Sequence, residues 1–83
     1  MTIIDVIYTH KTNKSFSMSK PVKGYVAPDG TFVSINLESL RVKAEGGQMY
    51  IHTDIKYIIH KNKRFTPNKI VNNGLVMLFI PQK

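Results

Sequence analysis

One stretch of the sequence, QMYIHTDIKYIIHKNKR, carries polar side chains at alternate positions among apolar ones. Its even-numbered residues include Tyr50, His52, Lys56 and His60. Three further cations, Lys61, Lys63 and Arg64, follow directly. On a β-strand the even-numbered residues share one face, because successive side chains point to opposite faces. Cations beside an accessible aromatic ring suit phosphate contacts combined with base stacking, so this face is a candidate site for single-stranded nucleic acid.

The positive charge of the chain is also segregated along its length. Twelve Lys and Arg residues against five Asp and Glu residues give a formal net charge of +7. No acid lies between Asp5 and Asp29, and none follows Asp54. Such segregation produces a one-sided electrostatic field, which favours a polyanionic partner. The alternative that the composition leaves open is a basic surface whose only effect is solubility.

The predicted interface combines cations for phosphates with rings for bases. Cations after Asp54 are expected to contact phosphates, and two lysines of an early loop flank them. These cations are Lys56, Lys61, Lys63, Arg64 and Lys69, flanked by Lys11 and Lys14. Tyr50, His52 and His60 are expected to stack on bases or to form hydrogen bonds with them.

The histidines also raise the question of a metal site or a nuclease. On an extended strand His52 and His60 lie about 26 Å apart, at roughly 3.3 Å per residue, so one ion cannot bind both. The His, Lys and Tyr side chains, with Asp54 to orient them, have the chemistry of an endoribonuclease. Alternate positions on a strand, however, do not converge on one reacting atom. We therefore expect no catalytic residue, no metal and no cofactor, and keep a small endoribonuclease as an alternative.

Hydrophobic periodicity predicts that residues 1–83 form a single, mainly β domain, built as a small antiparallel barrel or curled sheet. Residues 2–9 are rich in β-branched and aromatic side chains, and residues 14–20 alternate between polar and apolar. Both patterns are typical of strands. The sequences at Pro28–Gly30 and Asn72–Gly74 predict tight turns, because Gly and Asn tolerate positive φ.

The segment from Gln48 to Arg64 is expected to form one long antiparallel strand, because polar and apolar residues alternate along it. Its odd-numbered residues are expected to pack on the core, and they are Ile51, Thr53, Ile55, Tyr57 and Ile59.

The segment before this strand allows two interpretations. Asn36 is suited to cap a short helix over residues 37–45. The apolar alternation from Leu40 to Ala44 equally predicts a strand, with Gly46–Gly47 as the following hairpin turn. We favour the strand.

Both faces of the predicted strand LVMLFI, Leu75 to Ile80, are apolar. A chain of 83 residues has one core, which covers one face, and an uncovered second face promotes aggregation. We expect a second copy of the chain to cover it, which gives a homodimer through Leu75–Ile80. Coverage by a helix from residues 36–45 is the alternative.

The sequence also bears on the location of the protein. The absence of Cys is typical of a reducing compartment. The first residues lack the basic region of a signal peptide, and the longest apolar run, Leu75–Ile80, is too short to cross a bilayer. We expect a cytoplasmic protein without a membrane partner.

In length and in its richness in Asn and Lys, the chain resembles the small orphan accessory proteins that bacteriophages use to take over or disarm their hosts. The resemblance implies an inhibitor in the host cytoplasm. Its target would be a host protein such as an RNA-processing enzyme or an RNA-cleaving toxin, with or without RNA in the complex.

The residues themselves predict a non-catalytic nucleic-acid-binding protein. RNA is favoured over DNA because the sequence predicts no recognition helix for the major groove, and a strand face bears an aromatic ring. The inhibitor of a host protein is the alternative.

Overall fold

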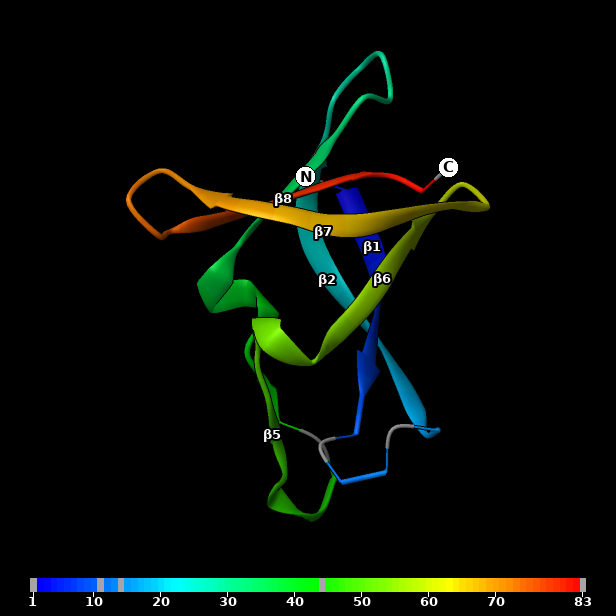
Figure 1. Ribbon diagram of the computed structural model, residues 1–83, viewed down its shortest axis with the longest axis vertical. Helices are drawn as coiled ribbons and strands as arrows, with labels where there is room; N and C mark the ends of the chain where they lie inside the picture. Colours follow the sequence, from blue (N-terminus) through cyan, green and yellow to red (C-terminus); the bar gives the residue numbers. More distant parts are fainter. Residues whose placement is uncertain (1, 11, 14, 44, 83) are drawn as a thin grey trace.

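The computed structural model describes residues 2–10, 12–13, 15–43 and 45–82, which form a mainly β domain as the periodicity predicts. Six strands close into an antiparallel barrel (Figure 1). In chain order the barrel strands are β1 (Thr2–Thr9), β2 (Ser17–Val26), β3 (Val33–Asn36), β6 (Ile55–His60), β7 (Lys63–Val71) and β8 (Val76–Pro81). Between β3 and β6 lie η1 (Leu37–Leu40), β4 (Val42–Lys43), η2 (Glu45–Gly47), β5 (Met49–Tyr50) and η3 (His52–Asp54), where η denotes a short 3-10 turn.

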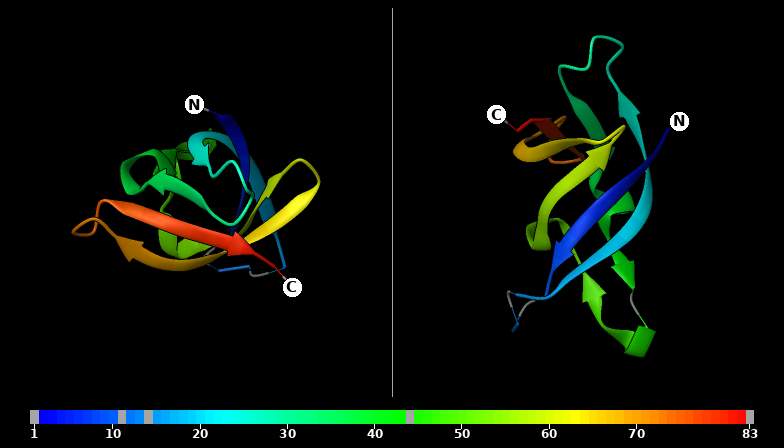
Figure 2. Two further views of the ribbon diagram at one scale, coloured as in Figure 1. Left: turned by 90° about the horizontal axis from the view of Figure 1, so that it is seen from above. Right: turned by 90° about the vertical axis from the view of Figure 1, so that its right-hand side faces the viewer.

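The barrel consists of two three-stranded meanders joined edge to edge. Neighbouring strands follow the order β1-β2-β3-β8-β7-β6, and β6 pairs with β1 to close the barrel. The segment that crosses from β3 to β6 holds β4 and β5, which form a separate two-stranded sheet. Seen from above, the barrel strands surround one interior (Figure 2).

The turn between β2 and β3 lies where the sequence predicts it. The N–H of Gly30 donates to the carbonyl of Ala27 at 2.9 Å, and Gly30 has a φ of 74°. The carboxylate of Asp29 accepts hydrogen bonds from the hydroxyl of Thr31 at 2.7 Å and from its N–H at 3.1 Å. These two bonds lower the pKa of Asp29, so the carboxylate keeps its charge and stabilises the turn.

The other hairpin turns also use residues at positive φ. Every residue of Asn72–Gly74 has positive φ, which confirms the predicted turn between β7 and β8. Lys61 and Asn62 have φ of 50° and 62° and form a two-residue turn between β6 and β7, in which His60 lies opposite Lys63. Two successive residues at positive φ match the right-handed twist of a hairpin.

One apolar core fills the barrel, and every barrel strand contributes inward-facing side chains to it. The core residues of the barrel strands are Ile4, Val6, Tyr8, Val22, Val33, Ile35, Ile58, Phe65, Met77 and Phe79. Leu40 and Tyr50 from the crossing segment complete the core. The hydroxyl of Tyr8 donates to the carbonyl oxygen of Leu40 at 2.8 Å, so the crossing segment is tied to the interior of the barrel.

The predicted single strand from Gln48 to Arg64 is wrong, because the chain turns at η3. The carboxylate of Asp54 accepts a hydrogen bond from the N–H of Ile51 at 3.0 Å, and the N–H of Asp54 donates to the carbonyl of Ile51 at 2.9 Å. This turn interrupts the alternation. The buried residues of the segment are the even-numbered Tyr50 and Ile58, and the predicted core-facing row is only half-buried or exposed.

Both features that the sequence allows for residues 37–45 occur in succession. The 3-10 turn η1 ends at Leu40, and β4 then pairs with β5, with Val42 opposite Tyr50. Gly46–Gly47 forms the turn between them, with both glycines at positive φ. The favoured strand is therefore confirmed at β4, although it begins after Leu40, and Ala44 lies outside the described residues.

The strand predicted within LVMLFI is confirmed as β8, and its two faces differ in burial. Met77 and Phe79 face the core, whereas Ile80 is 40% exposed and Leu75, just before the strand, is 64% exposed. The N–H of Leu37 donates to the carbonyl of Leu75 at 2.9 Å, so the 3-10 turn η1 lies beside the start of β8.

The buried hydroxyl of Tyr8 makes the fold sensitive to alkaline pH. Burial first, and the negative charge of Asp54 second, raise the pKa of Tyr8 to about 12. An unfolded tyrosine titrates near ~10, so the folded protein holds this proton more tightly than the unfolded chain. The contribution of Tyr8 to stability is fully present below about pH 10, and it falls by at most ~1.4 kcal/mol per pH unit as the pH rises towards 12.

We predict that Tyr8→Phe lowers the free energy of unfolding at neutral pH by about 1–3 kcal/mol, because the buried carbonyl of Leu40 loses its donor. Above pH 10 the difference from the parent should narrow, since only the parent loses stability through this hydroxyl. Urea denaturation followed by circular dichroism measures both effects. Tyr25→Phe, at a ring that is 50% exposed, is the control and should match the parent. A difference that stays constant through the alkaline range would contradict the prediction.

Candidate nucleic-acid interface

Most of the cations predicted to bind phosphate gather on the hairpin of β6 and β7, residues 55–71, which we term the basic hairpin. The two strands meet at the turn on the upper right of the barrel (Figure 1). The hairpin contains no Asp or Glu. Its cations are all exposed, and they are Lys56, Lys61, Lys63, Arg64 and Lys69. The fold thus presents an acid-free run of positive charge to solvent.

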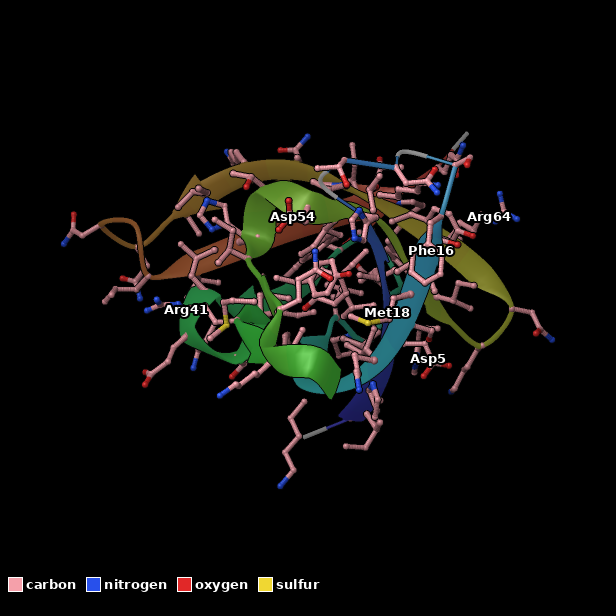
Figure 3. The ribbon with its side chains drawn as sticks, turned by 90° about the horizontal axis from the view of Figure 1, so that it is seen from below. Asp5, Phe16, Met18, Arg41, Asp54 and Arg64 are labelled. Atoms are coloured by element: carbon pink, nitrogen blue, oxygen red, sulfur yellow. The ribbon has the colours of Figure 1, made fainter. Side chains whose placement is uncertain are left out.

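The outer face of the basic hairpin carries a stacked cation and ring. Arg64 lies opposite Ile59, and its guanidinium carbon is 4.7 Å from the centroid of the Tyr57 ring. This distance is that of a cation–π contact. Arg64 projects from the side of the molecule, away from the barrel interior (Figure 3). The sequence pattern assigned Tyr57 to the core, but it lies on the outer face as the aromatic residue of this surface.

Two β-bulges set the positions of the lysines at the far ends of the hairpin. The pairing of β1 with β6 skips Lys56, which is therefore the extra residue of a bulge. The pairing of β7 with β8 skips Asn68, so that Lys69 lies opposite Leu78. Leu78 lies between two inward-facing residues of β8, and its partner Lys69 therefore belongs to the outer face of the barrel.

The tip of the basic hairpin and the β2–β3 hairpin together line a cavity of about 490 Å³. His60, Lys61 and Lys63 contribute to it from one side, and Asp29 from the other. The ammonium nitrogen of Lys63 lies 5.9 Å from the centroid of the Phe65 ring. His60 is thus grouped with the lysines, as the sequence predicts, with one carboxylate across the cavity.

Two of the predicted site residues do not join this surface. Tyr50 is 2% exposed and packs against Tyr8 with 5.8 Å between ring centroids, so its ring is not open for stacking on a base. His52 lies in η3 and lines a different cavity of about 470 Å³, together with Glu38 and Arg41. The continuous face from Tyr50 to Arg64 therefore does not exist.

Lys11 and Lys14, predicted as a flank, lie outside the described residues.

A further carboxylate, that of Asp5, borders the outer face of the basic hairpin. Asp5 is exposed on the outer face of β1 and lies opposite Ile59, which in turn lies opposite Arg64. Asp5 also projects outward from the barrel (Figure 3). The negative charge of Asp5 thus limits how far the basic surface extends across β1.

Comparisons with known proteins found no relative of this chain. It matches no protein-family model, and no curated protein or solved structure is significantly similar to it. Within residues 2–10, 12–13, 15–43 and 45–82, no three His, Cys, Asp or Glu side chains lie close enough together to hold a metal ion. None of the helical turns in the same part of the chain has the length and apolar character needed to span a membrane.

Proposed function

We propose that the protein binds single-stranded nucleic acid, RNA in preference to DNA, through the basic hairpin and without chemical reaction. The observation that carries the proposal is the acid-free hairpin itself, whose cations are all exposed and include Arg64 in contact with the Tyr57 ring. Phosphates supplied by a ligand neutralise these cations and give the hairpin its missing counter-charges.

The stack provides a way to hold a base as well as a phosphate. The guanidinium group of Arg64 lies over the Tyr57 ring, and Arg64 is exposed, so the side of the group away from the ring can meet a ligand. Unpaired bases stack on Arg planes as well as on aromatic rings. Lys61 in the turn and Lys69 on the outer face of β7 then contact phosphates on either side of the stacked base. Lys63 lies on the Phe65 side of the strand, so it contacts a phosphate at the end of the barrel.

A single strand suits this surface better than a duplex. Reading the major groove of DNA calls for a helix or a two-stranded ribbon that fits the groove. The helical segments described in this chain have three or four residues each. The ribbon of β6 and β7 is paired along its edges with β1 and β8, so it cannot enter the groove as a free ribbon. A strand with exposed bases can lie along β7 instead, and stacking on Arg64 requires no particular sequence.

We predict salt-dependent binding of a short single-stranded RNA with little sequence preference. If about five phosphates are neutralised, log K should fall against log salt with a slope of about −3 to −4, at ~0.7 per phosphate. Replacing Lys61, Lys63 and Arg64 together with Ala should weaken binding and reduce the slope to about −1 to −2. Fluorescence anisotropy of labelled RNA measures both quantities.

The matched control replaces Lys23, Arg41 and Lys43, which are exposed but lie outside the hairpin, and removes the same net charge. This control should keep most of the salt slope, and an equal loss in both triple variants would show that only net charge matters. A denaturing gel of the bound RNA should show intact strands. Cleavage that depends on His60 would instead support the endoribonuclease alternative.

We also predict that His60→Ala weakens RNA binding by about twofold or more, because a ring nitrogen of His60 can form a hydrogen bond with a phosphate. His60 shares its cavity with Lys61, Lys63 and Asp29. His52→Ala, in the cavity beside Glu38 and Arg41, is the matched control and should bind RNA as the parent does. Equal binding by both variants and the parent would remove His60 from the interface.

A protein partner is a second candidate, favoured by exposed apolar residues at and beside β8. Leu75 and Ile80 are 64% and 40% exposed, and Leu78 lies between inward-facing neighbours on the same strand. A second copy of the chain covers such a strip most simply, and a host protein bound by an inhibitor would use the same strip.

We predict that light scattering over a concentration series shows a dimer, and that Ile80→Asp makes the protein monomeric while it stays folded. Ile80 is on the outer face, so a carboxylate there disturbs an interface but not the core. Ser17→Asp, at an exposed position of β2 outside this strip, is the control and should leave the dimer intact. A parent protein that remains monomeric at the highest concentration would rule out the homodimer.

A further inference from the structure

A second candidate site is a cavity at the end of the barrel opposite the tip of the basic hairpin. It has a volume of about 540 Å³ and opens between the β1–β2 connection and the β4–β5 hairpin (Figure 3). Its lining residues are His10, Asn13, Phe16, Met18, Ser19, Lys20, Gln48 and Tyr50. A volume of this size is typical of sites for small molecules.

Lys20 is a cation on the inward-facing side of β2. It lies opposite Val6, which is fully buried, and its own side chain is half-buried. Lysine is seldom placed inside a fold unless a partner balances its charge. The described lining of the cavity includes no Asp or Glu. The ammonium group is therefore suited to an anion that comes from outside the chain.

His10 forms part of the cavity wall, and hydrogen bonds hold its ring in place. Its Nδ1 accepts hydrogen bonds from the backbone N–H groups of Thr12 at 3.1 Å and Asn13 at 3.2 Å. Its Nε2 lies 3.0 Å from the side-chain amide nitrogen of Gln48, and the hydroxyl of Tyr50 donates to Oε1 of the same amide at 3.4 Å. The two rings and the amide therefore hold one another in place along one side of the cavity.

Phe16 is an aromatic ring that the core does not use. It is 49% exposed at the mouth of the cavity, and its ring meets that of His10 edge to face, with centroids 5.9 Å apart. His10 also meets Tyr50 edge to face at 6.5 Å. One planar face of Phe16 is thus held in position beside fixed rings and remains accessible to a flat ligand.

We propose that this cavity binds a nucleotide, with the base stacked on Phe16 and the phosphate on Lys20. The Oδ1 of Asn13 accepts hydrogen bonds from Ser15, so the NH₂ group of this amide supplies donors for the edge of the base. The site is separate from the basic hairpin, and its evidence does not depend on the function proposed above. The same chemistry is presented by a free mononucleotide and by the terminal nucleotide of an RNA strand.

The outer surface connects this site to the basic hairpin. Tyr57 lies opposite Ile7 on β1, and Ile7 lies opposite Ser19 on β2, which lines the cavity. Two strand spacings of ~4.8 Å place the rim of the cavity roughly 10 Å from Tyr57. An RNA strand bound at the Arg64–Tyr57 stack therefore has a short path for its end into the cavity.

The test is a titration of the ¹⁵N-labelled protein with AMP, followed by amide chemical shifts. Shifts are expected at Phe16–Lys20 and at Gln48, with residues 61–64 unaffected. Adenosine and inorganic phosphate, added separately, should each bind about tenfold more weakly or worse, because each makes only part of the contacts.

Single substitutions test which side chain binds the phosphate of AMP and which binds its base. Lys20→Met keeps the apolar stem and should reduce the affinity for AMP to that for adenosine. Lys23→Met, on the outward side of the same strand, is the matched control and should bind AMP as the parent does. Phe16→Ala, at an exposed position, should lose both AMP and adenosine. The triple variant of Lys61, Lys63 and Arg64 should keep AMP binding, which separates this site from the hairpin.

A competition experiment between AMP and a short RNA shows whether the natural ligand is a free nucleotide or the end of an RNA strand. If a short RNA displaces AMP from the cavity, the ligand is the end of a strand; if both bind together, it is a free nucleotide. The proposal is overturned if AMP causes no shifts at Phe16–Lys20, or if Lys20→Met and Phe16→Ala both bind AMP as the parent does.

Discussion

Closure of six strands around one narrow interior is the constraint on which the rest of the structure depends. Each barrel strand has two paired neighbours, so each residue of a regular strand faces either the core or the outside. The interior has little spare space: a Cβ at Gly24 would lie 2.8 Å from side-chain atoms of both Ile4 and Ile35. Charged side chains of the strands are therefore placed on the outer face or at the two ends of the barrel, where both candidate sites lie.

The turn of the basic hairpin determines the register of β6 and β7, and with it the position of Arg64 over Tyr57. The two-residue turn at Lys61 and Asn62 fixes Arg64 opposite Ile59, and this register sets Arg64 above Tyr57. A shift of β7 by one residue in its pairing with β6 would turn Arg64 inward and Phe65 outward. The core contact of Phe65 and the exposed stack of Arg64 therefore stabilise the same register, so the packing of the interior also orders the outer surface.

The sequence predicts the β class, the turns at Pro28–Gly30 and Asn72–Gly74, and the acid-free cluster after Asp54, because composition and local turn chemistry determine these features. It does not predict which face of β6 is outside. Alternation indicates a face only while a strand is unbroken, and the side chain of Asp54 ends that strand through one hydrogen bond to Ile51. Tyr50 and Tyr57 consequently exchange their expected environments. The inward position of Lys20 was also missed, because it depends on the pairing with Val6.

The central claim is that RNA lies on the outer face of the basic hairpin. Photo-cross-linking with a short RNA that contains 4-thiouridine, followed by mass spectrometry of the linked peptides, locates the contact directly. The account predicts cross-links within residues 55–71, with Tyr57 and its strand neighbours among the linked positions. Cross-links confined to other strands, with none within residues 55–71, would contradict it.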